Sequence, residues 1–164
     1  SDRYCRESTT NRRISNQQIF RIMRPPTDDL FDLQQYDDFV RPLLPKIEQA
    51  QKIVIKGKIP SVNDLYDRYE HHVVKKDKVR QYEQDFYWQC PIRDRMIDTP
   101  FIMYAEVYMA TKSKDIDNCG KVLMDSLQRC HAITDDVLCS DIILRKFYDK
   151  DNPRVEFCLI PIEI

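Results

Sequence analysis

Four stretches of the chain carry apolar residues at the close spacing that is typical of β-strands. They are residues 53–59, 101–110, 137–148 and 155–159. From Phe101 to Met109 every other residue is apolar, which places these side chains on one face of an extended chain. Residues 149–153 have a turn-like composition, so we predict that the third and fourth strands pair antiparallel across this turn.

Residues that recur at spacings of three and four predict three helices. The recurring positions are Leu30, Leu33, Tyr36 and Val40 in the first, Val79, Tyr82 and Phe86 in the second, and Val122, Leu123, Ser126, Leu127 and Cys130 in the third. The second helix should end before Pro91, and Asp117 or Asn118 can cap the third. Together these elements predict an α/β (α+β) fold, in which a small mixed sheet of about four strands is packed with helices.

The first fifty residues differ from the rest of the chain, because they contain several arginines and little regular pattern before the pair Pro25-Pro26. We therefore divide the chain into an N-terminal extension, residues 1–50, and a domain, residues 51–164. We expect the extension to be partly helical or flexible. The simplest interpretation is a tail with one docked helix, and the alternatives are a cap on a dimer and a partner-binding segment.

Composition narrows the classes of function. Charged residues make up 32% of the chain and the formal net charge is -1, so any DNA-binding surface must be a local one. The chain has 2 glycines and no GxxxxGK or GxGxxG pattern, which argues against a glycine-rich phosphate loop. No apolar run reaches transmembrane length and no signal peptide is visible, so we expect an intracellular protein that does not contact a membrane.

The 6 cysteines include no CxxC pair. Most of them lie within apolar patterns, so we predict reduced thiols in the core of the protein. A zinc site formed by Cys119, Cys130, His131 and Cys139 is an alternative, but the spacing of these residues does not match the common zinc knuckles.

Three carboxylates and one lysine within residues 112–136 are the candidates for chemistry. Asp115 and Asp117 are two residues apart, so in an extended chain both side chains point the same way. Lys121 follows one helical turn after Asp117. We predict that the sheet and one helix bring Asp136 to the same end of the fold, where the carboxylates would hold Mg²⁺ or Mn²⁺. Such an ion can activate water for phosphodiester cleavage, and a nearby lysine can stabilise the developing charge.

These residues resemble the core of the RusA-type Holliday junction resolvases. The family pattern is Asp-x-Asp-Asn-x-x-Lys, then Asp-Ala-Leu, then an acidic pair. The matching segments here are Asp115-Ile116-Asp117-Asn118, Lys121, Asp125-Ser126-Leu127 and Asp135-Asp136, at the same spacing and without a gap. Upstream, Pro60-Ser61-Val62-Asn63 is similar to the end of the family's first strand, so the resemblance covers roughly residues 52–164.

The resemblance implies a small mixed α/β homodimer, an endonuclease that cuts four-way DNA junctions with Mg²⁺ in DNA recombination and repair. It implies that Asp115, Asp117 and Asp136 hold the metal and that Lys121 acts with them in catalysis. Such a substrate would place the protein in the cytoplasm, associated with the nucleoid. Ser126 stands where the family often has alanine, and this departure removes no catalytic group.

Candidate DNA contacts are basic residues and one asparagine that lie in or near these motifs. They are Lys75, Lys76, Lys78, Arg80, Lys112, Lys114 and Asn63. The first four form the strongest basic cluster, and an ordinary solvated helix face is an equally good interpretation of it. The aromatic residues close by, Tyr82, Phe86 and Trp88, are expected in the core rather than as platforms for base stacking.

Each catalytic candidate also has a structural alternative. Lys121 can pair with Asp125 one turn on, and Asp117 can serve as a helix cap. Asp135 is expected to shape the turn or to support the metal site indirectly. Because the net charge is close to neutral, a second hypothesis for the whole chain is a branched-DNA-binding or scaffold protein with weak or absent catalysis on the same fold. A nuclease for flaps or other branched forms is the third.

Overall fold

The structure, a computed structural model, describes residues 38, 40–61, 66–69 and 72–162, and of residues 66–69 and 72–75 the backbone only. The helices in this part of the chain are α3 (Leu43–Gln49), α4 (Asp77–Gln89) and α5 (Asp117–Arg129), with the 3-10 turn η2 (Asp136–Leu138). The strands are β1 (Ile53–Lys56), β2 (Tyr66–Tyr69), β3 (His72–Lys75), β4 (Phe101–Met109), β5 (Cys139–Tyr148) and β6 (Arg154–Pro161). The predicted α+β class, with a four-stranded mixed sheet, is confirmed.

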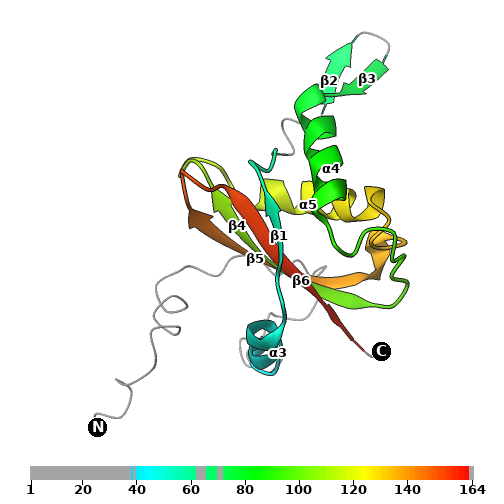
Figure 1. Ribbon diagram of the computed structural model, residues 1–164, viewed down its shortest axis with the longest axis vertical. Helices are drawn as coiled ribbons and strands as arrows, with labels where there is room; N and C mark the ends of the chain where they lie inside the picture. Colours follow the sequence, from blue (N-terminus) through cyan, green and yellow to red (C-terminus); the bar gives the residue numbers. More distant parts are fainter. Residues whose placement is uncertain (1–37, 39, 62–65, 70–71, 163–164) are drawn as a thin grey trace, which may run out of the picture.

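The main sheet has the strand order β1-β6-β4-β5 and lies at the centre of the molecule (Figure 1). β4 and β5 are parallel, whereas β6 runs antiparallel to β4 and to β1. The predicted pairing of the third strand, β5, with the last strand, β6, is therefore wrong. β4 is buried along almost its whole length. Its backbone N–H and C=O groups therefore need hydrogen-bond partners, which β5 and β6 supply on its two edges. The turn after β5 passes across the end of β4, where the Asp149 amide donates to the Met109 carbonyl at 2.9 Å.

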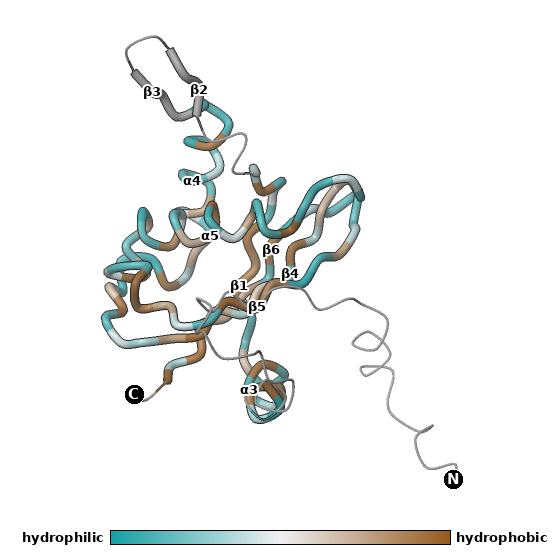
Figure 2. Tube along the Cα trace, turned by 180° about the vertical axis from the view of Figure 1, so that it is seen from behind, coloured by the Kyte–Doolittle hydropathy of each residue, from teal (hydrophilic) through white to brown (hydrophobic). Residues whose placement is uncertain are grey.

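Helices α4 and α5 pack on one face of this sheet and form the main core with it (Figure 1). Every position that the helical spacing predicted for them is buried. Phe86 of α4 stacks on Phe157 of β6 with ring centroids 5.9 Å apart. Figure 2 shows the matching hydrophobic segments along the central strands. α5 lies very close to the sheet at Gly120, where a Cβ atom would be 3.1 Å from the Leu144 side chain.

The segment between β1 and α4 differs from the prediction. β1 is shorter than the predicted strand 53–59, because Gly57 has φ +116° and turns the chain directly after Lys56. Farther along, β2 and β3 form a two-stranded antiparallel sheet, which the apolar spacing did not predict. The side chains of these two strands lie outside the described residues, as does most of the helix that was predicted between residues 30 and 40.

The opposite face of the main sheet is covered at one end by α3. Leu43 and Ile47 of α3 are buried against Ile102, Ile143 and Ile160 of the sheet. This apolar cluster is separate from the core beneath α4 and α5. The last part of the predicted N-terminal extension is therefore a helix docked on the sheet.

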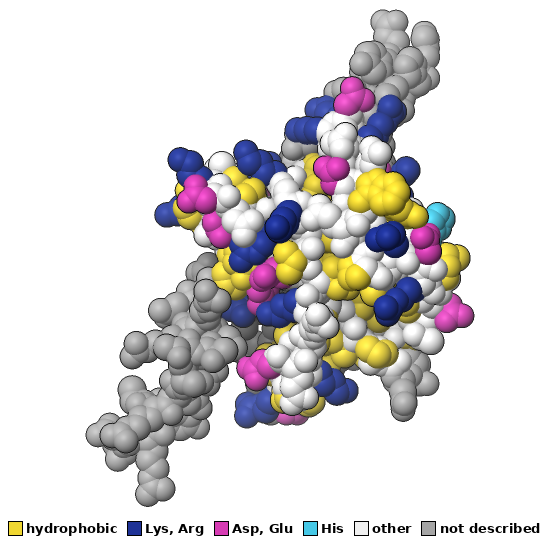
Figure 3. Space-filling view, in the orientation of Figure 1, with side chains coloured by type: hydrophobic (Ala, Val, Ile, Leu, Met, Phe, Trp, Pro, Cys, Tyr) yellow, Lys and Arg dark blue, Asp and Glu magenta, His cyan; other side chains and the backbone are white. Residues whose placement is uncertain are grey.

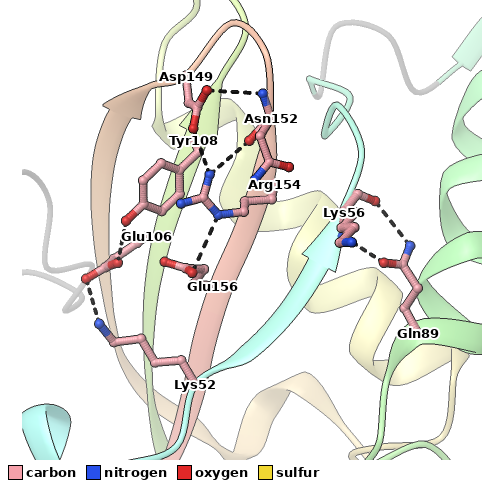
Figure 4. Close-up of polar contacts among 9 residues, drawn as sticks. All are labelled: Lys52, Lys56, Gln89, Glu106, Tyr108, Asp149, Asn152, Arg154 and Glu156. Atoms are coloured by element: carbon pink, nitrogen blue, oxygen red, sulfur yellow. Dashed lines mark hydrogen bonds and ion pairs between the residues drawn. The ribbon is translucent and has the colours of Figure 1, made fainter.

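At its other end, the same face carries a cluster of charged and aromatic side chains (Figure 4). Glu106 of β4 is buried, and it accepts hydrogen bonds from Lys52 at 2.8 Å and from the hydroxyls of Tyr104 and Tyr108 at 2.8 and 3.0 Å. Burial by itself raises the pKa of Glu106, but the three hydrogen bonds outweigh it and hold the pKa below its usual value. The ionised carboxylate therefore ties the start of β1 to the middle of β4.

We expect Glu106→Gln to lower the free energy of unfolding by about 2 kcal/mol at pH 7, because charge-assisted hydrogen bonds to a buried group are lost. A carboxylate whose pKa is lower in the folded than in the unfolded chain adds stability above its unfolded pKa, and this contribution is lost as the pH falls through the folded pKa. The difference in the free energy of unfolding between wild type and variant should therefore shrink below about pH 4. Urea unfolding at pH 7 and at pH 3 measures it, with the exposed Glu48→Gln as control; a difference that does not depend on pH contradicts this role of the charge.

Candidate active site

Asp115 and Asp117 lie at the end of the sheet where β4 and β5 finish. β4 ends at Met109, a loop follows, and Asp117 is the first residue of α5. Both aspartates are exposed. The N-cap residue of α5 is Ile116, which makes no side-chain capping bond, so the predicted cap by Asp117 or Asn118 is wrong. In the first turn, the carboxylate of Asp117 is favoured instead by the positive end of the helix dipole.

Lys146 of β5 holds the loop that carries these aspartates. Its ammonium group donates to the carbonyl oxygen of Lys112 at 2.9 Å and also to the carbonyl oxygen of Lys114. The Lys112 side chain lies over the Tyr148 ring, 5.3 Å from its centroid. Lys146 was not among the predicted site residues. The signal that could have revealed it is a lysine inside the mainly apolar run 137–148.

We expect Lys146→Met to loosen the loop that leads to Asp115, because two carbonyl oxygens lose their common donor. Amide exchange in residues 111–116 should become faster, and hydrogen exchange measures this effect. The exposed Lys150→Met is the matched control. Unchanged exchange in this loop would contradict the positioning role of Lys146.

Asp136 lies at the other end of the sheet, where β4 and β5 begin. It is the first residue of η2, is exposed, and precedes the start of β5 at Cys139. Asp135 is the N-cap of this turn, because its side chain accepts a hydrogen bond from the Val137 amide at 3.0 Å. This bond agrees with the expectation that Asp135 shapes the turn.

The direction of α5 separates the two groups of carboxylates. Because β4 and β5 are parallel, the helix that connects them runs back along the sheet (Figure 1). Its 13 residues span about 20 Å, with Asp115 and Asp117 at its start and Asp136 beyond its end. The prediction that one chain brings all three to the same end of the fold is therefore wrong. Among the described residues, no group of three His, Cys, Asp or Glu side chains is arranged to hold a metal ion.

Lys121 lies on the exposed side of α5, one turn after Asp117. Its ammonium group is 2.9 Å from Oδ1 of Asp125, which is the pairing weighed above as the alternative to catalysis. An exposed pair at this spacing contributes only about 0.5 kcal/mol, so it is easily exchanged for a stronger contact. Pairing with Asp125 is therefore compatible with a role of Lys121 at a phosphate.

The predicted DNA contacts are mostly exposed where the structure describes them. Lys78, Arg80, Lys112 and Lys114 are exposed, and Lys76 is half-buried. Asn63 and the side chain of Lys75 lie outside the described residues. Positive charge therefore gathers at two places in the described part of the chain. One is the start of α4, and the other is the loop that leads to Asp115.

The cysteines that the structure describes are free thiols. Cys90, Cys119, Cys130 and Cys158 are buried, and Cys139 is half-buried. Burial raises the pKa of Cys119 and of Cys139 to about 11, so both thiols are protonated at neutral pH. Their placement agrees with the prediction of core thiols.

Comparison with known protein families finds a match to endodeoxyribonuclease RusA over residues 56–159. The chain belongs to the RusA family. The matched region runs from the end of β1 into β6 and contains the four predicted catalytic residues, Asp115, Asp117, Lys121 and Asp136. A search of curated proteins finds no match to the chain.

Membership of the RusA family makes this chain an endodeoxyribonuclease, from a family that acts on branched DNA and resolves Holliday junctions. The family match begins after α3, so the docked helix lies outside the matched region. In the part of the chain that the structure describes, every helix is too short or too polar to cross a bilayer.

Proposed function

We propose that this RusA-family nuclease is a metal-dependent homodimer that resolves four-way DNA junctions in recombination and repair. It would act inside the cell, associated with the nucleoid. Mg²⁺ is the proposed cofactor, and Mn²⁺ can substitute for it. The observation that carries the proposal is the exposed pair Asp115 and Asp117 at the start of α5, with Lys121 one turn on, inside the region that matches RusA.

The available side chains fit a hard divalent cation. Asp115 and Asp117 offer only oxygen atoms, are exposed, and stand where the loop that Lys146 holds in place leads into α5. Mg²⁺ is usually bound by one or two carboxylates, with water and substrate phosphate in the remaining positions. When bound, such an ion would supply a water of lowered pKa and would stabilise negative charge on the scissile phosphate. Asp115, Asp117 and Asp136 are the residues that would hold it.

Lys121 has a different role in the proposed mechanism. Its side chain is 58% exposed and lies on the same helix as Asp117, so it can reach a phosphate held near the carboxylates. The ammonium group would stabilise the negative charge that develops on the phosphoryl oxygens during cleavage. In the absence of DNA the pair with Asp125 keeps this group on the outer side of α5.

A second copy of the chain would complete the site. Asp136 lies about a helix length, roughly 20 Å, from Asp115 and Asp117, so one chain does not gather the three around one ion. In a two-fold symmetric dimer, Asp136 of each copy could lie beside the Asp115–Asp117 pair of the other, which gives two identical sites. Two sites related by a two-fold axis suit the two symmetric strands of a four-way junction.

The test is cleavage of a labelled four-way junction with and without Mg²⁺ or Mn²⁺, alongside a linear duplex of the same sequence. We expect paired, symmetric nicks near the crossover that require the metal and are absent from the duplex. Flap and three-way substrates in the same assay separate junction resolution from a broader activity on branched DNA. Cutting that is equal on all substrates, or that persists in a chelator, contradicts the proposal.

The near-neutral net charge of -1 favours one second candidate, a branched-DNA-binding or scaffold protein with weak catalysis. The same assay decides between the two. Binding of the junction without products at any metal concentration supports the scaffold, whereas metal-dependent nicks support the nuclease.

A further inference from the structure

Three side chains at and after the end of α4 form a group that the proposed mechanism does not use. The Tyr87 and Trp88 rings meet edge to face, with centroids 5.2 Å apart. The guanidinium carbon of Arg93 lies over both rings, 5.6 Å from the Tyr87 centroid and 6.0 Å from the Trp88 centroid. We call Tyr87, Trp88 and Arg93 the Trp88 patch.

In the Trp88 patch, Trp88 is exposed, Tyr87 and Arg93 are half-buried, and the three side chains are pre-organised. Trp88 is 66% exposed, whereas Phe86, two residues earlier on α4, is fully buried, so the expectation that Trp88 belongs to the core is wrong. Arg93 is held in place because its Nη1 donates to the carbonyl oxygens of Trp88 and Cys90, both at 3.3 Å. The side chains have therefore already lost much of the freedom that binding a partner would cost. Figure 3 shows exposed hydrophobic side chains beside the lower part of α4, next to Lys and Arg side chains.

The Trp88 patch belongs to the end of the sheet that carries Asp136. The segment after α4 is hydrogen-bonded to the segment after α5, for example from the Ile97 amide to the Ala132 carbonyl at 2.9 Å. That second segment leads within a few residues to Asp136. DNA bound at Asp136 would therefore pass close to this part of the surface.

We propose that the Trp88 patch stacks on an unpaired base at the branch point of the DNA. Every base has a flat π face, and recognition of unstacked bases relies on aromatic rings and arginine guanidinium groups. Tyr, Trp and Arg are also common at protein interfaces, but the RusA family acts on branched DNA, whose bases are least well stacked at the crossover. This inference deepens the proposed function and depends on it.

The chain has 1 tryptophan, Trp88, so tryptophan fluorescence reports on the patch alone. In the Asp117→Asn variant, in which we expect cleavage to be abolished, a four-way junction should quench this fluorescence and protect Trp88 from acrylamide, and a linear duplex should do neither. Junction binding with unchanged fluorescence, or equal quenching by the duplex, overturns the proposal. A change that follows protein concentration in the absence of DNA also overturns it, because the patch would then be a contact between copies.

Variants give a second, independent measurement. Trp88→Ala should weaken junction binding about tenfold, measured by fluorescence anisotropy of labelled DNA, and Trp88→Phe should restore most of it. Arg93→Ala should weaken binding less. Leu44→Ala, at another exposed apolar position, is the matched control and should have no effect. If wild-type protein neither binds nor cuts branched DNA, the proposed function fails as well; if it does both and Trp88→Ala behaves as wild type, only the base-stacking proposal fails.

Discussion

Asp117→Asn is expected to abolish junction cleavage while the DNA still binds. The substitution keeps the size of the side chain and removes the negative charge that would hold the metal, so the rate should fall by at least about a thousandfold, which is roughly 4 kcal/mol of the barrier. Binding should stay equal or become tighter, because a carboxylate next to the DNA phosphates is neutralised. Single-turnover cleavage and anisotropy on the same labelled junction measure the two effects.

The control for this experiment is Asp151→Asn, which neutralises an exposed aspartate in the turn before β6. It should cut like wild type. Asp115→Asn should behave like Asp117→Asn. Cleavage at the wild-type rate by Asp117→Asn would remove Asp117 from the mechanism, whereas loss of both binding and cleavage would indicate a structural role at the start of α5.

A mixture of two inactive chains is expected to regain activity. If Asp136 of one copy completes the site of the other, a heterodimer of Asp117→Asn and Asp136→Asn has both changes in one site and none in the second. That dimer should nick the junction at about half the wild-type rate, and it should nick one strand instead of two. Co-expression with two different tags, followed by purification on both, isolates the heterodimer for the cleavage assay.

The matched control is the heterodimer of Asp115→Asn and Asp117→Asn. Both aspartates stand at the start of α5 in the same chain, so each site of that dimer carries one change and both should be inactive. Absence of activity in the first heterodimer would show that the site is not shared in this way. Activity in both would mean that at least one aspartate of the pair is not essential.

Much of the fold follows from local patterns. The burial of Val79, Tyr82 and Phe86 in α4 and of the recurring positions of α5 was predicted from spacing, because a helix on a sheet must bury one face. The alternation from Phe101 to Met109 located β4, although the structure buries both of its faces. Family membership was also readable at this level, because the carboxylate and lysine motif lies within a short, continuous stretch of chain.

What spacing did not reveal depends on contacts between residues far apart in the sequence. The turn after β5 predicted a hairpin of β5 and β6. Both edges of the buried strand β4 need hydrogen-bond partners, however, so β6 pairs with one edge of β4 and β5 with the other. The anchoring of the loop before Asp115 by Lys146 crosses more than thirty residues of sequence and has no local signal beyond a lysine in an apolar run. The exposure of Trp88 likewise depends on where α4 ends on the sheet.

The sequence by itself therefore determined the family, the types of the elements that form the main core and the identity of the candidate catalytic residues, because each is encoded in neighbouring positions. Only the tertiary structure decided which ends of the sheet these residues occupy. A parallel pair of strands joined by one helix necessarily puts the start of the helix and the start of the next strand at opposite ends. That geometry separates Asp136 from Asp115 and Asp117 within one chain, and it is the physical reason to look for the complete site in a dimer.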